Sequence, residues 1–184
     1  MTVRWPVVVL GAAATLLLSV GSLVLIGISS GGIGSLGGTS AIGCPPPGLK
    51  GSVVRVTLSN MGHANVNGMM GAGAMSLRAD RATVSSGAVS FLVSNVGSRS
   101  HELIVLPLGG STLAGSRALG GDSRVDESNS LGEASASCAA GEGEGILPGT
   151  SGWVTLTLAP GRYELLCNLP GHYAAGMYSQ LTVK

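Results

Sequence analysis

A succession of short β-rich stretches, each bounded by Gly, Pro, Asn or Ser, constrains the fold of this sequence more than any other feature. Within one of them Val154, Leu156 and Leu158 alternate with threonines, which is the two-residue period of a strand that buries one face. The 31 glycines and an aromatic content of 3% favour turns and small side chains over long helices. We therefore predict an all-β fold, a Greek-key sandwich or barrel. The predicted strands lie at 51–58, 74–84, 87–95, 100–107, 152–159, 161–167 and 177–183.

The stretch 108–150 interrupts this series of strands. It is rich in Gly, Ser and Ala, is too long for a plain hairpin loop, and has room for a short helix. Residues 122–144 contain six acidic residues and one basic residue, Arg124. This excess of negative charge indicates either a solvated loop or a docking patch. These acidic residues are Asp122, Asp126, Glu127, Glu133, Glu142 and Glu144.

The start of the chain indicates export. No charge occurs between Pro6 and Ile28, Arg4 precedes this run, and about 20 apolar residues suffice for a helix to cross a bilayer. We therefore predict that residues 1–28 form an apolar helix that anchors the chain as a single pass. The positive-inside rule then places the remainder on the outer, periplasmic or extracellular, face of the cell membrane. Cleavage of this segment as a signal peptide, with secretion, and lipid attachment at Cys44 are the alternatives.

The remaining sequence divides into a linker and one domain. Residues 29–48 are rich in Gly and Ser and end in three prolines, so we predict a linker there and a single domain at 49–184. Arg4 is the one charge before Lys50, so the 10 basic residues less Arg4 leave nine, against 9 acidic residues. A neutral domain without a basic stripe is not expected to bind nucleic acid, whose affinity for proteins depends on phosphate neutralisation.

The segment CNLPGHYAAGM, residues 167–177, carries the chemistry. It places Cys167, His172 and Met177 at intervals of five, and Pro170 and Gly171 bend the chain between them. A strand that ends at the cysteine and resumes near the methionine can therefore direct all three side chains to one point. His101, which opens an apolar strand, is the best remaining imidazole. Two nitrogens, one thiolate and a weak thioether are the ligand set of blue copper.

This segment resembles the copper loop of the cupredoxins, the plastocyanin, azurin and sulfocyanin group, and the likeness extends over about residues 48–184. The resemblance implies that His101 and His172 are equatorial ligands of one copper ion, Cys167 the equatorial thiolate and Met177 the axial thioether. It also implies an electron carrier and not an enzyme, because four protein ligands leave no open position on the metal. The expected partner is a cytochrome, a respiratory complex or a copper oxidase.

The resemblance extends to the route of the electron. His172 is the expected exit edge, and a flat docking surface is expected from the small apolar residues around it, Leu169, Pro170, Ala174 and Ala175. One departure is Glu102, which stands where several relatives have a small polar residue after the upstream histidine, and this leaves the hydrogen bond to the sulfur open. The 108–150 stretch is also longer than in the smallest members.

Other interpretations of the same residues remain. A structural zinc site would need a stronger fourth ligand than a thioether, and a nucleophilic Cys–His pair would need a third group to orient the base. Neither accounts for Met177, and the three residues could also be ordinary turn and core residues. A copper chaperone or storage protein that delivers copper to an oxidase, and a noncatalytic copper domain in oxidase assembly, are the alternative functions.

Two further features concern sulfur. With Cys167 assigned to the metal, we predict a disulfide between Cys44 and Cys138, since an odd cysteine count outside the cell implies one thiol with another role. The segment 61–75 is either a second copper site, because thioethers suit Cu(I), or a turn-rich connection with methionines in the core. Its candidate ligands are Met61, His63, Met69, Met70 and Met75.

Overall fold

The computed structural model describes residues 44–60 and 75–184, and every regular element within them is a β-strand. The all-β prediction is confirmed for this part of the chain, and each predicted stretch contains a strand. The strands are β1 (Ser52–Ser59), β2 (Ser76–Ala79), β3 (Thr83–Val84), β4 (Gly87–Asn95), β5 (Leu103–Pro107), β6 (Gly132–Ala134), β7 (Ser151–Leu158), β8 (Gly161–Leu166) and β9 (Tyr178–Val183).

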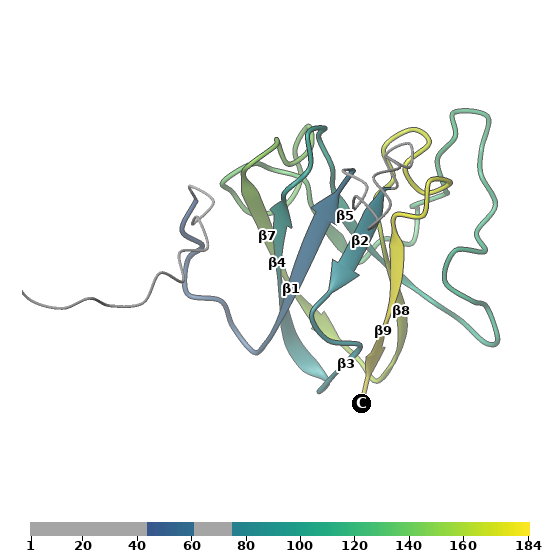
Figure 1. The fold of residues 1–184 in the computed structure, drawn as a ribbon. Coiled ribbons are helices and arrows are strands. Elements are labelled where there is room, and N and C mark those ends of the chain that lie inside the picture. The colour runs from purple at the N-terminus through teal and green to yellow at the C-terminus, as the bar shows by residue number, and fades with distance from the viewer. Residues whose placement is uncertain (1–43, 61–74) are drawn as a thin grey trace, which may run out of the picture. The chain divides into compact units, whose positions relative to one another are not determined.

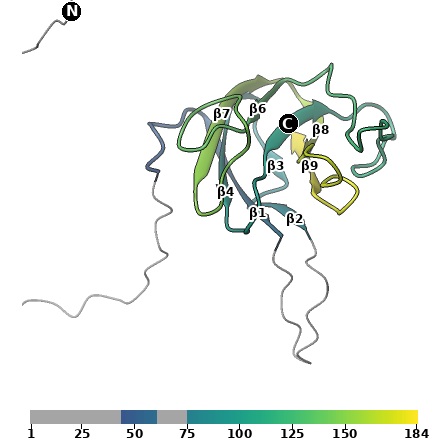
Figure 2. The same ribbon diagram turned by 90° about the horizontal axis from the view of Figure 1, so that it is seen from above.

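The strands form two mixed sheets that face each other (Figure 1). The first has the order β2-β1-β4-β7, in which β1 and β4 run parallel and the other pairs antiparallel. Seen from above, its strands follow one another in this order (Figure 2). The second has the order β3-β9-β8-β5-β6, with β3 and β9 parallel. The edges meet where β2 contacts β9 and β6 contacts β7.

The core lies between the two sheets and follows the two-residue period of the sequence. In β1 the inward residues Val54, Val56 and Leu58 are at most 1% exposed, and Arg55 and Thr57 between them face solvent. The inward residues of β4 are Val89, Phe91 and Val93, all completely buried. Burial of each such side chain contributes about 1.5–3 kcal/mol, so this alternation sets which face of each strand points inward.

The predicted strand at 74–84 is in fact two strands in different sheets. β2 pairs with β1 in the first sheet, whereas β3 pairs with β9 in the second. The chain turns at Asp80, whose Oδ1 accepts a hydrogen bond from Arg55 N at 2.9 Å, while Asp80 N donates to Arg55 O at 2.9 Å. This exchange ends the pairing with β1, so the chain is free to cross to the other sheet.

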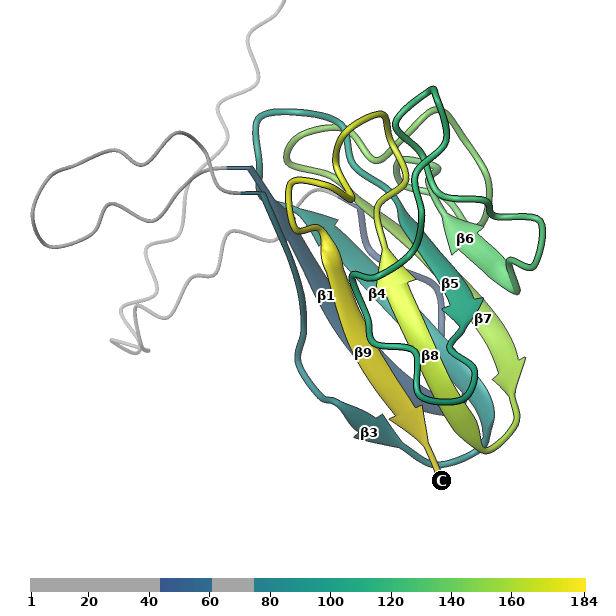
Figure 3. The ribbon, with the colours of Figure 1, turned by 90° about the vertical axis from the view of Figure 1, so that its right-hand side faces the viewer.

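The stretch 108–150 contains no helix, so the expectation of a short helix there was wrong. Its one named strand is the three-residue β6, and the rest consists of turns in which several glycines have positive φ, among them Gly115 at 85°. Glycine adopts that conformation without the penalty of a Cβ, and this favours turns over helix. In Figure 3 the teal segment after β5 passes in front of β8, and it supplies Val125 to a small second core with Ile104 and Leu166.

A disulfide joins Cys44 to Cys138, as predicted, with the two Cα atoms 5.0 Å apart. The segment around Cys138 runs beside β7, where Cys138 N donates to Ser151 O and Ala140 forms a parallel bridge with Trp153. The disulfide thus attaches the residues before β1 to the edge of the first sheet.

Several predictions fall on residues outside those described. They are the apolar helix at 1–28, most of the linker at 29–48, and the candidate copper ligands at positions 61–70. The boundary of the domain at residue 49 also stays a prediction. Among residues 44–60 and 75–184 there is no helix long and apolar enough to cross a membrane.

Candidate metal centre

The structure brings His101, Cys167 and His172 together at one end of the two sheets. One nitrogen of each imidazole and the Sγ of Cys167 all lie within 4.8 Å of one another. Cys167 and His101 are completely buried, and His172 is 9% exposed. His101 forms an antiparallel bridge with Ile146 just before β5, and Cys167 follows directly after β8. The cluster therefore joins neighbouring strands of one sheet to the loop that follows β8.

The loop at 167–177 is closed by its own backbone hydrogen bonds. Cys167 N donates to Met177 O at 3.0 Å, so the two ends of the loop lie side by side, and Met177 N donates to His172 O at 3.2 Å. Gly171 has φ of 80°, the left-handed conformation in which glycine is preferred. Met177 is completely buried immediately before β9. The spacing of five thus places the cysteine, histidine and methionine at the same end of the molecule.

The donor atoms point toward one another. Cys167 Sγ lies 3.3 Å from His172 Nδ1, and His172 Nδ1 lies 3.2 Å from His101 Nδ1. The two imidazole rings are inclined at 57° with their centroids 5.0 Å apart, so they converge on one point and do not stack. Two imidazole nitrogens and one sulfur around a common point match the equatorial donors of blue copper.

Burial determines the charge of these groups. It lowers the pKa of His101 to about 4, helped by His172 and Arg99, and it lowers the pKa of His172 as well. Both imidazoles are therefore neutral near pH 7 and present lone pairs. Burial also raises the pKa of the Cys167 thiol to about 12, so the thiolate needs a bound cation to be stable there. A reactive cysteine has the opposite features, namely a lowered pKa and solvent access, which argues against a nucleophile.

The sulfur receives hydrogen bonds from backbone amides, and those of Leu169 and Glu102 both lower the pKa of the thiol, against the effect of burial. Glu102 N donates to Cys167 Sγ at 3.4 Å, so the donor does not depend on which side chain follows His101. The Glu102 carboxylate instead accepts a hydrogen bond from Asn168 N at 3.0 Å. Burial, with Glu133 adding repulsion, raises the pKa of Glu102 to about 7. The departure from the family pattern therefore leaves a donor to the sulfur in place.

Asn60 is a neighbour of the cluster that sequence reasoning missed. Its Oδ1 lies 3.3 Å from His101 Nε2 and accepts hydrogen bonds from Ser98 N at 2.7 Å and Arg99 N at 3.2 Å. With Nε2 of His101 turned to this acceptor, Nδ1 faces the cluster, which is how ligand histidines are commonly oriented. An asparagine after a strand is ordinary in sequence, and nothing in the local pattern places it 41 residues away beside His101.

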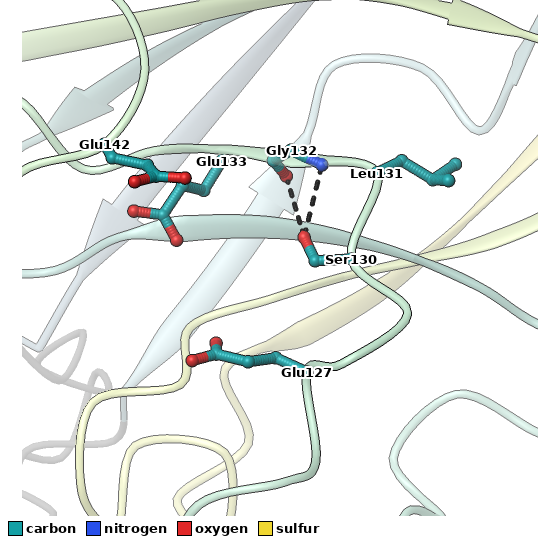
Figure 4. Close-up of a pocket in the computed structure, with 6 residues that line it drawn as sticks. All are labelled: Glu127, Ser130, Leu131, Gly132, Glu133 and Glu142. Atoms are coloured by element: carbon teal, nitrogen blue, oxygen red, sulfur yellow. Dashed lines mark hydrogen bonds between the residues drawn. The ribbon is translucent and has the colours of Figure 1, made fainter.

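The acidic stretch surrounds a surface hollow next to, but separate from, the cluster. The hollow has a volume of about 480 Å³, and Figure 4 shows the side chains that line it. They are Glu127, Ser130, Leu131, Gly132, Glu133 and Glu142, none of which belongs to the His101–Cys167–His172 cluster. Ser130 Oγ accepts from Gly132 N at 3.2 Å and so closes the turn at one edge of the hollow.

Similarity to known proteins was found among solved structures and with a family model. Among solved structures, a dithionite-reduced auracyanin from the photosynthetic bacterium Roseiflexus castenholzii is 21% identical with a TM-score of 0.45, over 74% of this chain and 99% of its own. A rusticyanin from Thiobacillus ferrooxidans is 18% identical with a TM-score of 0.43, over 73% of this chain and 79% of its own. No curated protein matches. The family model described as copper-binding proteins of the plastocyanin/azurin family matches residues 63–184.

Proposed function

Because this chain belongs to the plastocyanin/azurin family of copper-binding proteins, the cupredoxins, we propose that it is an electron carrier whose one type 1 copper ion is held by His101, Cys167, His172 and Met177. The observation that carries this proposal is the convergence of two imidazole nitrogens and one cysteine sulfur within 4.8 Å. Such a set, with a buried methionine at the adjoining strand, suits copper better than zinc, which prefers a stronger fourth ligand.

These residues would bind the metal and leave no coordination position on it for a substrate. Copper, when bound, would alternate between Cu(I) and Cu(II) with no open coordination site. The backbone hydrogen bonds across 167–177 and the bond from Glu102 N to Sγ keep the donors in place in both states. Complete burial of Cys167 and His101 also favours an electron carrier over a copper chaperone, because delivery of the metal requires access to it.

The electron would leave through His172, the one member of the cluster with exposed surface, at 9%. Pro170, Ala174 and Ala175 around it are exposed, and Leu169 is half-buried, so they form the proposed docking surface for a redox partner. A cytochrome, a respiratory complex or a copper oxidase is the proposed partner. Ala174→Asp should slow electron exchange with that partner and leave copper bound, and stopped-flow mixing measures both.

The direct test is a visible absorption and spin-resonance spectrum of the protein loaded with Cu(II). We expect an intense thiolate-to-copper band that disappears in Cys167→Ser. The matched control is the double variant Cys44→Ser/Cys138→Ser. It removes the sulfur atoms of the other two cysteines and should keep the thiolate-to-copper band. A colourless wild type, or a Cys167→Ser variant that keeps the band, would show that the proposal is wrong.

The proposed location is the outer face of the membrane, with residues 1–28 as a single-pass anchor or, alternatively, a cleaved signal. The disulfide between Cys44 and Cys138 supports an oxidising compartment, where such bonds persist. Protease treatment of spheroplasts tests this placement, since an outward-facing domain is degraded or released and an inward-facing one is protected. N-terminal sequencing of the mature protein separates an anchor from a cleaved signal.

A further inference from the structure

A buried carboxylate lies on the outer side of β8, away from the metal cluster's donor atoms. Glu164 is completely buried, and its Oε2 accepts a hydrogen bond from Arg117 Nε at 2.5 Å. Its Oε1 accepts two more, from Gly115 N at 2.6 Å and from the hydroxyl of Tyr173 at 3.0 Å. We call these four residues the Glu164 network. A buried ion pair is weak evidence for stability, so the network calls for another role.

The network connects the segment after β5 to the residue next to His172. Arg117 N donates to Tyr173 Oη at 3.0 Å, and Arg117 also donates to Pro107 O at 2.6 Å. The Tyr173 hydroxyl thus accepts one hydrogen bond and donates another, and the residue is 3% exposed. A shift of the backbone at His172 would therefore also move Tyr173 and break these hydrogen bonds, and each buried polar group left without a partner costs about 1–3 kcal/mol.

The same segment also forms hydrogen bonds with the part of the loop that precedes His172. Gly171 N donates to Ser123 O at 3.1 Å, and Asn168 Oδ1 accepts from Val125 N at 2.8 Å. The segment 108–131 therefore bonds to the loop both before and after His172. A loop held at these points has few ways to change the orientation of the imidazole between them.

We propose that Glu164 and Tyr173 are positioning residues that, together with segment 108–131, fix the orientation of His172. This rests on the proposed function, in which His172 binds copper. The segment that lengthens this chain relative to the smallest cupredoxins is thus part of the support of the metal site. Its role is to keep His172 Nδ1 near Cys167 Sγ, at the 3.3 Å that the structure shows.

The test compares two single-hydroxyl deletions on one scaffold. Tyr173→Phe removes the hydrogen bonds to Glu164 and from Arg117 N. Tyr163→Phe removes the bond from Tyr163 Oη to Ala159 O, 2.7 Å, at the opposite end of β8. We expect Tyr173→Phe to bind Cu(II) about 10-fold more weakly and to alter its spin-resonance spectrum, in keeping with the effect of groups behind metal ligands. Tyr163→Phe should bind like wild type. Adding Glu164→Gln to Tyr173→Phe should lower the copper affinity little further, because both changes break the same hydrogen-bonded network between segment 108–131 and Tyr173.

A second readout needs no copper. In the metal-free protein the amides of His172 and Met177 should exchange with solvent at least about 5-fold faster in Tyr173→Phe, the factor that corresponds to one of the two hydrogen bonds this variant loses. Equal exchange and equal copper affinity in the two tyrosine variants would overturn the positioning role. A wild type without a thiolate-to-copper band would refute the proposed function instead, and the exchange rates would still decide whether the network positions the loop.

Discussion

Single residues that form hydrogen bonds with the donor side chains determine much of the geometry of the candidate metal site. Cys167, His101 and His172 are buried neutral groups whose pKa values are displaced by desolvation, upward for the thiol and downward for the imidazoles. The orientation of each donor atom therefore depends on the neighbouring groups that form hydrogen bonds with its side chain. For the sulfur that neighbour is a backbone amide, at Glu102, and for His101 it is a side-chain oxygen, at Asn60.

Asn60→Ala tests the orientation of His101. The variant removes the acceptor that faces His101 Nε2 and serves the amides of Ser98 and Arg99, so the imidazole becomes free to rotate. We expect copper affinity to fall about 10-fold or more, measured by competition with a chelator. Asn60→Asp keeps an acceptor oxygen and should retain most of the affinity. An alanine variant with wild-type affinity would contradict this role.

Glu102→Pro tests the hydrogen bond to the sulfur. Proline has no N–H, so Cys167 Sγ loses the donor 3.4 Å away, whereas Glu102→Ala keeps it. A donor stabilises the more negative thiolate of the reduced site, so its loss should lower the reduction potential. The change should amount to a fraction of the roughly 1.5–3 kcal/mol of a hydrogen bond to a charged group. Voltammetry that finds proline and alanine variants at the same potential would refute this account.

At the scale of elements, the turns decide how strands are shared between the sheets. β2 and β3 are separated by the turn at Asp80, which bonds to Arg55 in the middle of β1. Burial by itself would raise the pKa of Asp80, but the Arg81 guanidinium and the Arg55 amide together outweigh it, so the net pKa of this carboxyl is lowered. The charged form of this carboxylate is therefore the one that stabilises the turn.

Asp80→Ala should lower the free energy of unfolding by about 1 kcal/mol near pH 7. Because the folded-state pKa is lowered, the stabilisation is complete above the unfolded pKa and is lost as the pH falls through the folded one. The difference between wild type and Asp80→Ala should thus narrow below about pH 4, in urea unfolding at several pH values. Asp80→Asn, which keeps an acceptor, should lie between them. A constant difference down to pH 2 would be inconsistent with this assignment.

At the scale of the described domain, one disulfide and one long segment supplement the sandwich. The disulfide joins positions 94 residues apart and attaches the chain before β1 to the edge of β7. The segment 108–131 covers the outer side of β5 and β8 and contributes to a second small core. The metal cluster lies between the chain just before β5, the residue after β8 and the loop that segment 108–131 contacts, so its geometry depends on the packing of these elements.

Removal of the disulfide should destabilise the folded domain without removal of copper. For a loop of this length the chain-entropy estimate is about 4–5 kcal/mol, and strain or residual structure reduces it. The variant Cys44→Ser/Cys138→Ser should therefore unfold at a lower denaturant concentration than wild type, by fluorescence of the tryptophans, and still bind copper. Equal unfolding midpoints would show that the bond adds nothing to stability.

The sequence by itself indicated the seven stretches that contain β1 to β5 and β7 to β9, the direction of their inward faces and the loop that carries Cys167, His172 and Met177. These features depend on neighbours along the chain: alternation in stretches such as 152–159, and the spacing of Cys167, His172 and Met177. It also identified His101 and the cysteine pair, because few imidazoles and thiols were available. Local periodicity and residue chemistry are sufficient for such inferences.

Only the tertiary structure decided which groups support the donors. The amide of Glu102, the oxygen of Asn60 and the carboxylate of Glu164 reach their partners across 65, 41 and 9 residues of sequence, through the pairing of strands and the path of segment 108–131. The division of 74–84 between two sheets and the lack of a helix in 108–150 have the same origin. Contacts between distant segments depend on how whole elements pack, and no local pattern in the chain encodes that packing.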